Sequence, residues 1–218
     1  MTNYVDGSFF KQYDLNFLNN FLADHGQNFS FRWIERDQFK IKTEAIGIIL
    51  ASSGEIMGPV TGKIKTNDIV LLALGDYFLI GNPRILVVLG SNLFSQPEII
   101  KQADFKVLPS TLGGTRKLIK DDKGKFNIDA HLIWVDKNNV KIPHYHTRLF
   151  ELYLTEKGSG EILLRNAKEQ ETVAVKLRPG GFVLVAPNTI HKAQGDNLVI
   201  MVVGIPAFYN DDSFKIEI

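Results

Sequence analysis

Two histidines and a glutamate lie close together in the second half of the chain, with a spacing that suits a metal site. The segment IPHYHTRLFELYLTEKG contains His144 and His146, then four residues, and then Glu151. Because alternate residues of a β-strand point to the same face, His144 and His146 present both imidazoles to one side. The four intervening residues can turn the chain so that Glu151, on the next strand, faces the same point. Gly158 then supplies the tight turn that closes this hairpin.

The donor atoms of these side chains favour a first-row transition metal. Two neutral imidazoles and a carboxylate suit iron, manganese, zinc, nickel or cobalt, whereas calcium and magnesium prefer shells of oxygen atoms. A fourth ligand should come from a strand that is distant in the sequence. The segment LRPGGFVLVAPNTIHKAQG places His191 at a turn that follows a fully apolar strand. We therefore predict one divalent transition metal held by His144, His146, Glu151 and His191.

Both segments resemble the conserved motifs of the cupin superfamily. The first contains the His-X-His pair, the Glu and the closing Gly of the first motif, and the second resembles the Gly, five residues, Pro, X, Gly, two residues, His of the second motif. Asn138 replaces the leading Gly, Ala186 replaces the Pro, and Asn188 replaces the turn Gly. Asn tolerates a left-handed backbone, and none of the three is a metal ligand. The resemblance covers residues 111–218 and implies a small jelly-roll barrel with its metal near the mouth.

An internal repeat suggests that the first half of the chain is a second, related barrel. Three blocks match in the same order: 66–78 with 179–191, 85–90 with 199–204, and 45–56 with 151–162. Ordered blocks indicate a duplicated unit, although any two β-meanders share part of this pattern. We therefore expect a bicupin, with a degenerate cupin-like barrel and an N-terminal helix in residues 1–110 and a metal-binding cupin barrel in residues 111–218.

The ligand positions are not kept in the first half. The repeat aligns Gln38 and Lys40 with the His-X-His pair, Ala45 with Glu151, and Phe78 with His191. Side chains of Lys, Ala and Phe cannot form a divalent site, so we expect one metal per chain.

The remaining pattern is typical of short strands preceded by one helix. Aromatic residues recur at three- and four-residue spacing from Phe10 to Phe21, which predicts an amphipathic helix over 8–24. Its aromatic stripe would have to cover a barrel face or a homodimer contact. From Phe31 onward, short apolar segments separated by Gly, Pro, Asn and Asp favour an all-β sandwich or barrel over βαβ units. The alternating tail 214–218 predicts a closing strand.

Further side chains near the predicted metal are candidates for catalysis. Arg148 lies in the turn before Glu151 and could bind an anionic substrate or simply be solvated. Tyr153 shares the strand face of Glu151, where it could line the cavity together with Trp134 and aliphatic residues. Glu151 itself could leave the metal and act as an acid or base. We interpret His131 as a hydrogen-bonded core residue rather than as a base.

The composition excludes several classes of protein. The chain has 25 Lys and Arg against 24 Asp and Glu, so it offers no basic surface for nucleic acid. It has no cysteine, which excludes disulfide scaffolds, thiolate zinc sites and a Cys nucleophile. The longest apolar runs have the length of strands, and the amino terminus lacks the pattern of a secretory signal. We therefore expect a cytoplasmic protein with a small-molecule substrate and no membrane or nucleic-acid partner.

Three functions are compatible with these residues. Three His and one Glu are, by the resemblance, typical of cupin dioxygenases, so the first hypothesis is a mononuclear iron(II) dioxygenase acting on a small organic molecule. The second is a redox-neutral isomerase, epimerase or lyase, in which the metal polarises a carbonyl or carboxylate. The third is a non-catalytic small-molecule-binding barrel. The sequence identifies neither the substrate nor the metal, for which Mn, Zn, Ni and Co stay open beside Fe.

Overall fold

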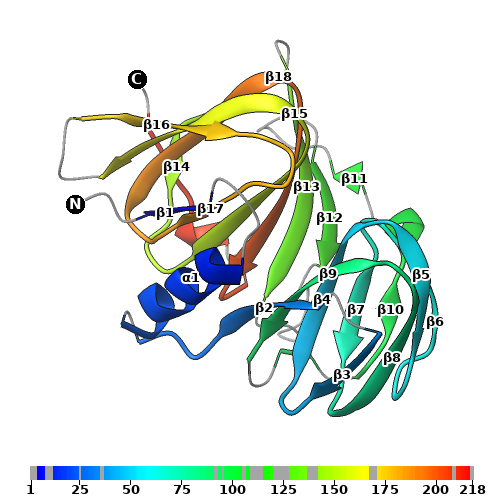
Figure 1. The fold of residues 1–218 in the computed structure, drawn as a ribbon. Helices are drawn as coiled ribbons and strands as arrows, with labels where there is room; N and C mark the ends of the chain where they lie inside the picture. Colours follow the sequence, from blue (N-terminus) through cyan, green and yellow to red (C-terminus); the bar gives the residue numbers. More distant parts are fainter. Residues whose placement is uncertain are drawn as a thin grey trace. The chain divides into compact units, whose positions relative to one another are not determined.

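The chain forms two compact units, each made almost entirely of antiparallel β-strands (Figure 1). The computed structural model describes residues 4–7, 12–24, 26–34, 37–90, 93–94, 96–104, 107–108, 115–119, 128–136, 142–166, 171–207 and 210–216. The N-terminal unit comprises residues 12–105 and 122–127, and the C-terminal unit comprises residues 1–11, 106–121 and 128–218. The predicted all-β fold with one short N-terminal helix is confirmed.

Two sheets build the N-terminal unit. The first has the order β10 (Ile99–Ile100), β7 (Ile69–Leu72), β4 (Ala45–Ala51), β9 (Arg84–Leu89) and β2 (Ser30–Ile34). The second has the order β3 (Gln38–Ile41), β8 (Gly75–Gly81), β5 (Ser53–Met57) and β6 (Gly62–Lys65). A short 3-10 helix, η1 (Gln102–Asp104), follows β10. One buried apolar cluster takes residues from both sheets, which identifies the unit as a sandwich-like barrel.

Helix α1 (Gln12–Asp24) precedes these strands but buries a different stripe from the predicted one. Leu15, Leu18 and Leu22 are buried, whereas Phe17 is 64% exposed. Leucines at this spacing form a continuous stripe on a helix, and the aromatic stripe lies beside it. Asn19 joins the helix to β2 by two hydrogen bonds with the backbone of Phe31. Phe10 and His25 lie outside the described residues, and in the described part of the chain no helix has the length and hydrophobicity to cross a membrane.

The C-terminal unit is one extended sheet that curls around its own core. The main path runs β1 (Tyr4–Gly7), β17 (Phe182–Val185), β15 (Phe150–Asn166), β18 (Thr189–Ile205), β13 (Asp129–Val135), β12 (Thr115–Ile119) and β11 (Val107–Leu108). Off this path, β16 (Val173–Leu177) pairs with β15, and β14 (His144–Tyr145) pairs with β18 and with β19 (Phe214–Lys215). A 3-10 helix, η2 (Asn210–Asp212), precedes β19, which forms at the start of the predicted closing strand.

The longest strands, β15 and β18, pair along their length and carry the curvature. Their pairing shifts register near Lys157, as expected for β-bulges that bend a sheet. Further along, Gly160 lies opposite Gly195. A Cβ on Gly160 would lie 2.3 Å from the backbone oxygen of Gln194, so only glycine allows the two backbones to approach there.

Corresponding strands pair in the same order in the two units. In the N-terminal unit, β4 pairs with β7 and β9, and β5 pairs with β6 and β8. In the C-terminal unit, the first part of β15 pairs with β17 and the end of β18, and its second part pairs with β16 and the start of β18. The glycine contact is repeated as well, because Gly54 lies opposite Gly81 and a Cβ on Gly54 would lie 2.3 Å from the oxygen of Ile80.

The register of these pairs corrects part of the predicted alignment by one residue. Gly195 and Gly81 are the glycines of the two repeated contacts. His191 lies four positions before Gly195, and the residue four positions before Gly81 is Tyr77, not Phe78. β14 pairs His144 with the buried His191. In β3, Phe39 pairs with Tyr77, which is buried as well, whereas Gln38 pairs with the half-exposed Phe78.

With the repeat aligned by this register, the positions that match the His-X-His pair are Phe39 and Ile41, not Gln38 and Lys40. Ala45 keeps the predicted place of Glu151, because Ala45 lies between Leu72 and Leu89 as Glu151 lies between Val185 and Gly204.

Apolar packing occupies these positions of the N-terminal unit. Phe39, Ile41, Ala45 and Tyr77 are all buried members of its core. The rings of Phe39 and Tyr77 stack with centroids 5.3 Å apart, and the Tyr77 hydroxyl donates to the Ala73 carbonyl at 3.0 Å. Phe78, by contrast, is 48% exposed.

Candidate metal centre

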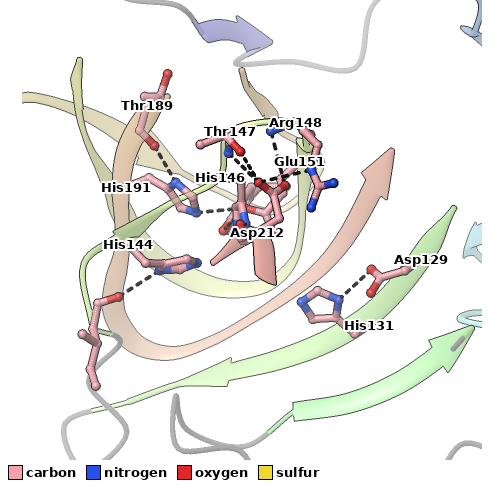
Figure 2. A network of polar contacts seen from close by, with 12 residues as sticks. Asp129, His131, His144, His146, Thr147, Arg148, Glu151, Thr189, His191 and Asp212 are labelled. Atoms are coloured by element: carbon pink, nitrogen blue, oxygen red, sulfur yellow. Dashed lines mark hydrogen bonds and ion pairs between the residues drawn. The ribbon is translucent and has the colours of Figure 1, made fainter. Parts of the chain in front are cut away.

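The four predicted ligands of the C-terminal unit come together. His144 lies on β14, His146 directly follows it, Glu151 lies on β15, and His191 lies on β18 (Figure 2). One nitrogen or oxygen of each side chain lies within 4.8 Å of those of the other three, in an arrangement that could hold a metal ion. His146, Glu151 and His191 are buried, and His144 is partly buried. Among the described residues, this is the one such group of His and acidic side chains.

Each imidazole uses its Nδ1 atom to bind a backbone carbonyl. The acceptors are Ile142 for His144, at 2.9 Å, Thr189 for His191, at 2.9 Å, and Asp212 for His146. A carbonyl oxygen can only accept a hydrogen bond, so the proton must be on Nδ1 in all three rings. In a neutral imidazole, the lone pair is then on Nε2, which is the arrangement found in metal-binding histidines.

Glu151 completes the cluster with one carboxylate oxygen. Its Oε2 lies 2.8 Å from His191 Nε2 and 3.6 Å from His146 Nε2. With the ring protons on Nδ1, these nitrogens would direct lone pairs at a carboxylate oxygen, which is favourable only if a positive charge lies among them. A proton or a divalent cation would supply that charge, and the mixed nitrogen and oxygen set fits a first-row transition metal. The residues therefore fit the predicted group.

Burial and mutual charge shift the ionisation of these side chains. Burial lowers the pKa of His144 to about 3, with a further lowering by the neighbouring His191, so this imidazole is neutral at pH 7. Burial opposes ionisation of Glu151, but the neighbouring imidazoles, first His146 and then His191, hold the pKa of that carboxyl far below its usual range. The cluster therefore has the protonation state that metal binding requires, namely a carboxylate beside a neutral imidazole.

Tyr153 lies next to the cluster on the same face of β15. Its hydroxyl donates to Glu151 Oε2 at 3.2 Å, and its ring meets that of His191 edge-on with centroids 5.8 Å apart. Burial, together with the adjacent charge of Glu151, raises the pKa of the Tyr153 hydroxyl well above its usual value. Tyr153 is therefore a neutral hydrogen-bond donor that orients the carboxylate.

The surroundings of the cluster are mainly aliphatic. Leu164 lies opposite His191 in the sheet, and Val185 lies opposite Glu151, and both are buried. Trp134 is not part of this lining. Its neighbours Ile133 and Val135 belong to the core cluster of the unit, and alternate residues of a strand point to opposite faces, so Trp134 lies on the other face of β13.

His131 lies apart from the ligand cluster (Figure 2), and the guanidinium of Arg148 is turned to the aspartates of η2. The guanidinium of Arg148 contacts the carboxylate of Asp211 at 2.8 Å, and the side chain is 54% exposed. His131 Nδ1 lies 3.2 Å from the buried carboxylate of Asp129, which agrees with a hydrogen-bonded histidine rather than a ligand.

The sequence reasoning missed Asp212, which lies 65 positions after Thr147 and is 2% exposed. Asp212 accepts hydrogen bonds from the ligand segment with both its backbone and its side chain. No spacing signal points to this residue, because it lies far from both motifs in the sequence.

Comparison with known proteins gives matches in structure but none in sequence. No protein-family model matches the chain, and no curated protein does. A 7S globulin from Momordica charantia superposes with a TM-score of 0.62 at 14% identity, over 83% of this chain and 73% of the globulin. A mutant of Bacillus subtilis oxalate decarboxylase superposes with a TM-score of 0.68 at 9% identity, over 88% of this chain and 72% of that protein. A vicilin from tomato, Solanum lycopersicum, has a TM-score of 0.62 at 11% identity.

These neighbours are cupin-fold proteins, and the likeness shows that this chain has the cupin fold of jelly-roll β-barrels. The resemblance inferred from the two motifs is confirmed at this level. Identities this low show the fold alone, so the function depends on the side chains described above.

Proposed function

We propose that this chain is a metal-dependent cupin enzyme that acts on a small organic molecule, with a mononuclear iron(II) dioxygenase as the first form to test. The observation that carries the proposal is the convergence of His144, His146 and His191 on Glu151 with Nδ1 of each ring bound to a carbonyl. A bound iron(II) ion supplies redox chemistry toward dioxygen, and a redox-inactive ion supplies Lewis acidity. Manganese, zinc, nickel and cobalt are the other ions that this donor set accepts.

The protein's own side chains would hold and orient the reacting groups. Tyr153 fixes one carboxylate oxygen of Glu151 by hydrogen bonding. Buried aliphatic residues such as Val185 and Leu164 keep bulk water from the buried ligands and favour a partly apolar substrate. Arg148 already contacts Asp211, so binding an anionic substrate through Arg148 would require this contact to break.

A redox-neutral reaction is the second candidate function. Structural neighbours described as oxalate decarboxylase with Mn(II) centres favour it, because a decarboxylase is a lyase. In that case Glu151 is the group placed to take up or release a proton at Oε2, where the Tyr153 hydroxyl stabilises its ionised form. An outcome without any conversion, but with metal-dependent ligand binding, would instead support a binding protein.

We further propose that the N-terminal unit is a degenerate copy of the barrel, as in a bicupin. The shared order of strand pairing and the repeated glycine contact support this proposal. Phe39 and Tyr77 fill the equivalent interior, so this unit would contribute packing rather than chemistry. The cytoplasmic location, the homodimer and the absence of nucleic-acid and membrane partners stay predictions.

The proposal can be tested with protein purified without an affinity tag. Metal analysis identifies the ion, and the metal-free chain is then reloaded under anaerobic conditions with iron(II) or manganese(II). Small organic molecules are screened for oxygen uptake and, in parallel without oxygen, for conversion. Oxygen uptake that requires iron and is lost in His191→Ala, but not in His131→Ala, supports the dioxygenase. Conversion without oxygen supports the second candidate, and a chain that retains no metal contradicts both.

A further inference from the structure

The C-terminal segment reaches back to the metal-ligand segment through one buried residue, Asp212. Its backbone carbonyl accepts a hydrogen bond from His146 Nδ1. Its Oδ1 accepts from the backbone N–H of Thr147 at 2.8 Å and from the Thr147 hydroxyl, and its Oδ2 accepts from the backbone N–H of Arg148 at 3.3 Å (Figure 2). A single residue thus binds three consecutive residues of the segment that contains the His-X-His pair.

We propose that Asp212 is a positioning residue that holds His146 in its metal-binding orientation and tautomer. This inference rests on the proposed metal site, although the contacts themselves do not depend on a metal. The carbonyl fixes the proton on Nδ1 and leaves Nε2 for the metal. The carboxylate in turn holds this carbonyl in place, because its hydrogen bonds from Thr147 and Arg148 attach Asp212 to the segment that contains His146.

The burial of the carboxylate shows that these bonds are needed. The Asp212 side chain is 3% exposed, and a buried charge is tolerated only where hydrogen bonds compensate for lost hydration. Three donors supply these hydrogen bonds, namely the backbone N–H groups of Thr147 and Arg148 and the hydroxyl of Thr147. Both oxygens of the Asp212 side chain thus accept hydrogen bonds from the ligand segment.

His146 differs in this respect from the other two histidines. The Nδ1 acceptors of His144 and His191 are Ile142 and Thr189, each two residues earlier in the same segment. The acceptor of His146 is 66 positions away in sequence. The orientation of two rings is thus set locally, whereas the third depends on the C-terminal segment being in place.

Strand β19 extends the same contact to the other end of the ligand segment. It pairs with β14, with Lys215 opposite His144 and Phe214 opposite Tyr145. The rings of Tyr145 and Phe214 stack with centroids 5.0 Å apart and an interplanar angle of 20°. The segment 210–216 therefore lines the ligand segment from Pro143 to Arg148.

The test compares two neighbouring aspartates in the full chain. In Asp212→Ala, Co²⁺ binding to the metal-free protein should weaken roughly 10- to 100-fold, the usual effect of losing a partner that orients a metal ligand. Asp211→Ala is the matched control, because the Asp211 side chain is 77% exposed and, among the described residues, contacts only the guanidinium of Arg148. Asp212 also lies 3.7 Å from Arg148 Nε, but it is Asp212 that accepts from the backbone of Thr147 and Arg148. Its Co²⁺ affinity should change less than about threefold.

A second measurement separates positioning from general destabilisation. In the metal-free protein, ¹⁵N chemical shifts of the imidazoles report which nitrogen carries the proton. We expect the Nδ1–H form for His146 in the natural sequence and a mixture of tautomers in Asp212→Ala, with His144 and His191 unchanged. Thr147→Val, which removes one donor to the carboxylate, should weaken Co²⁺ binding in the same direction, and Thr147→Ser should restore it.

The outcomes are distinguishable from failure of the proposed function. If the natural chain binds no Co²⁺, the proposed function fails, while the tautomer measurement still tests Asp212. If Asp212→Ala is folded by circular dichroism and keeps both its Co²⁺ affinity and its His146 tautomer, the inference is overturned. If Asp212→Ala does not fold, the Thr147 pair decides, and equal Co²⁺ affinity of Thr147→Val and Thr147→Ser overturns it.

Discussion

At the scale of single residues, the candidate metal centre combines three imidazoles and one carboxylate, and the spacing of these residue types marks them in the sequence. His-X-His on a strand can present both rings to one side, and Glu151 follows after four residues that can form a turn. The partners of these ligands could not be found in this way. Backbone carbonyls such as those of Ile142 and Thr189 carry no residue signal, and Asp212 lies too far along the chain for any spacing argument.

Loss of a ligand should abolish metal retention without unfolding the chain. In His191→Ala, Co²⁺ affinity should fall by more than the roughly 100-fold that loss of an orienting partner causes. The fold should persist, because the unit has its own apolar core of residues such as Val183 and Ile200. A Co²⁺ titration tests the loss of affinity, and circular dichroism of the same variant tests whether the fold persists. His131→Ala is the control, and loss of metal from that variant as well would contradict the assignment of ligands.

Removal of the Tyr153 hydroxyl should weaken the site more mildly. Tyr153→Phe keeps the ring but loses the hydrogen bond to Glu151 Oε2. Hydrogen bonds to charged groups contribute about 1.5–3 kcal/mol, so a loss of metal affinity of about tenfold or more is expected if the bond persists with metal. Isothermal titration with Co²⁺ measures it. An unchanged affinity would show that the hydroxyl turns away from the carboxylate once the metal is bound.

The metal-free protein should lose stability in acid partly through His144. Its pKa is about 3 in the folded chain, below the ordinary value near 6.5 in the unfolded chain. The unfolded state therefore binds the proton more readily, and stability falls as the pH drops from about 6.5 toward 3, by at most about 1.4 kcal/mol per pH unit for one proton. Urea unfolding at several pH values measures this slope. His144→Ala should have a shallower slope in this range, and an equal slope would contradict the assignment.

At the scale of strands, the order of elements was predictable but the register was not. Short apolar segments between turn residues correctly indicated β-strands. Aligning them by residue type placed Phe78 where the pairing places Tyr77. A shift of one residue moves every side chain of a strand to the other face. The alternation of Phe39 and Ile41 with exposed Gln38 and Lys40 was the signal that could have fixed the register.

This register predicts opposite results for two neighbouring aromatic residues of β8. Tyr77 is fully buried against Phe39, so Tyr77→Ala should destabilise the N-terminal unit by about 3–5 kcal/mol, as for other aromatic residues in cores. Phe78 is half exposed, and Phe78→Ala should cost far less. Neither change should alter Co²⁺ affinity. Urea unfolding of the two variants tests this, and a larger effect of Phe78→Ala would contradict the register.

At the scale of the whole molecule, the sequence indicated two barrels from one repeat. The two compact units and their shared strand pairing are compatible with a duplication. The helix shows the limit of such reasoning, because two apolar stripes lie side by side on α1 and only packing selects the leucine stripe. Which stripe is buried depends on contacts that a single sequence does not contain.

The two units lead to a prediction about metal content. The C-terminal unit has a complete ligand set, whereas the equivalent positions of the N-terminal unit hold the apolar side chains of Phe39, Ile41, Ala45 and Tyr77. We therefore expect one transition metal ion per chain, measured by elemental analysis of protein purified without an affinity tag.

Chelation should remove this ion and leave the β-sheet circular dichroism at room temperature unchanged, because both units have their own apolar cores and do not need a metal to fold. Two ions per chain would show that a second ligand set exists and would contradict the degenerate assignment of the N-terminal unit. Loss of β-sheet on chelation would make the site structural, and would remove most of the support for a catalytic metal.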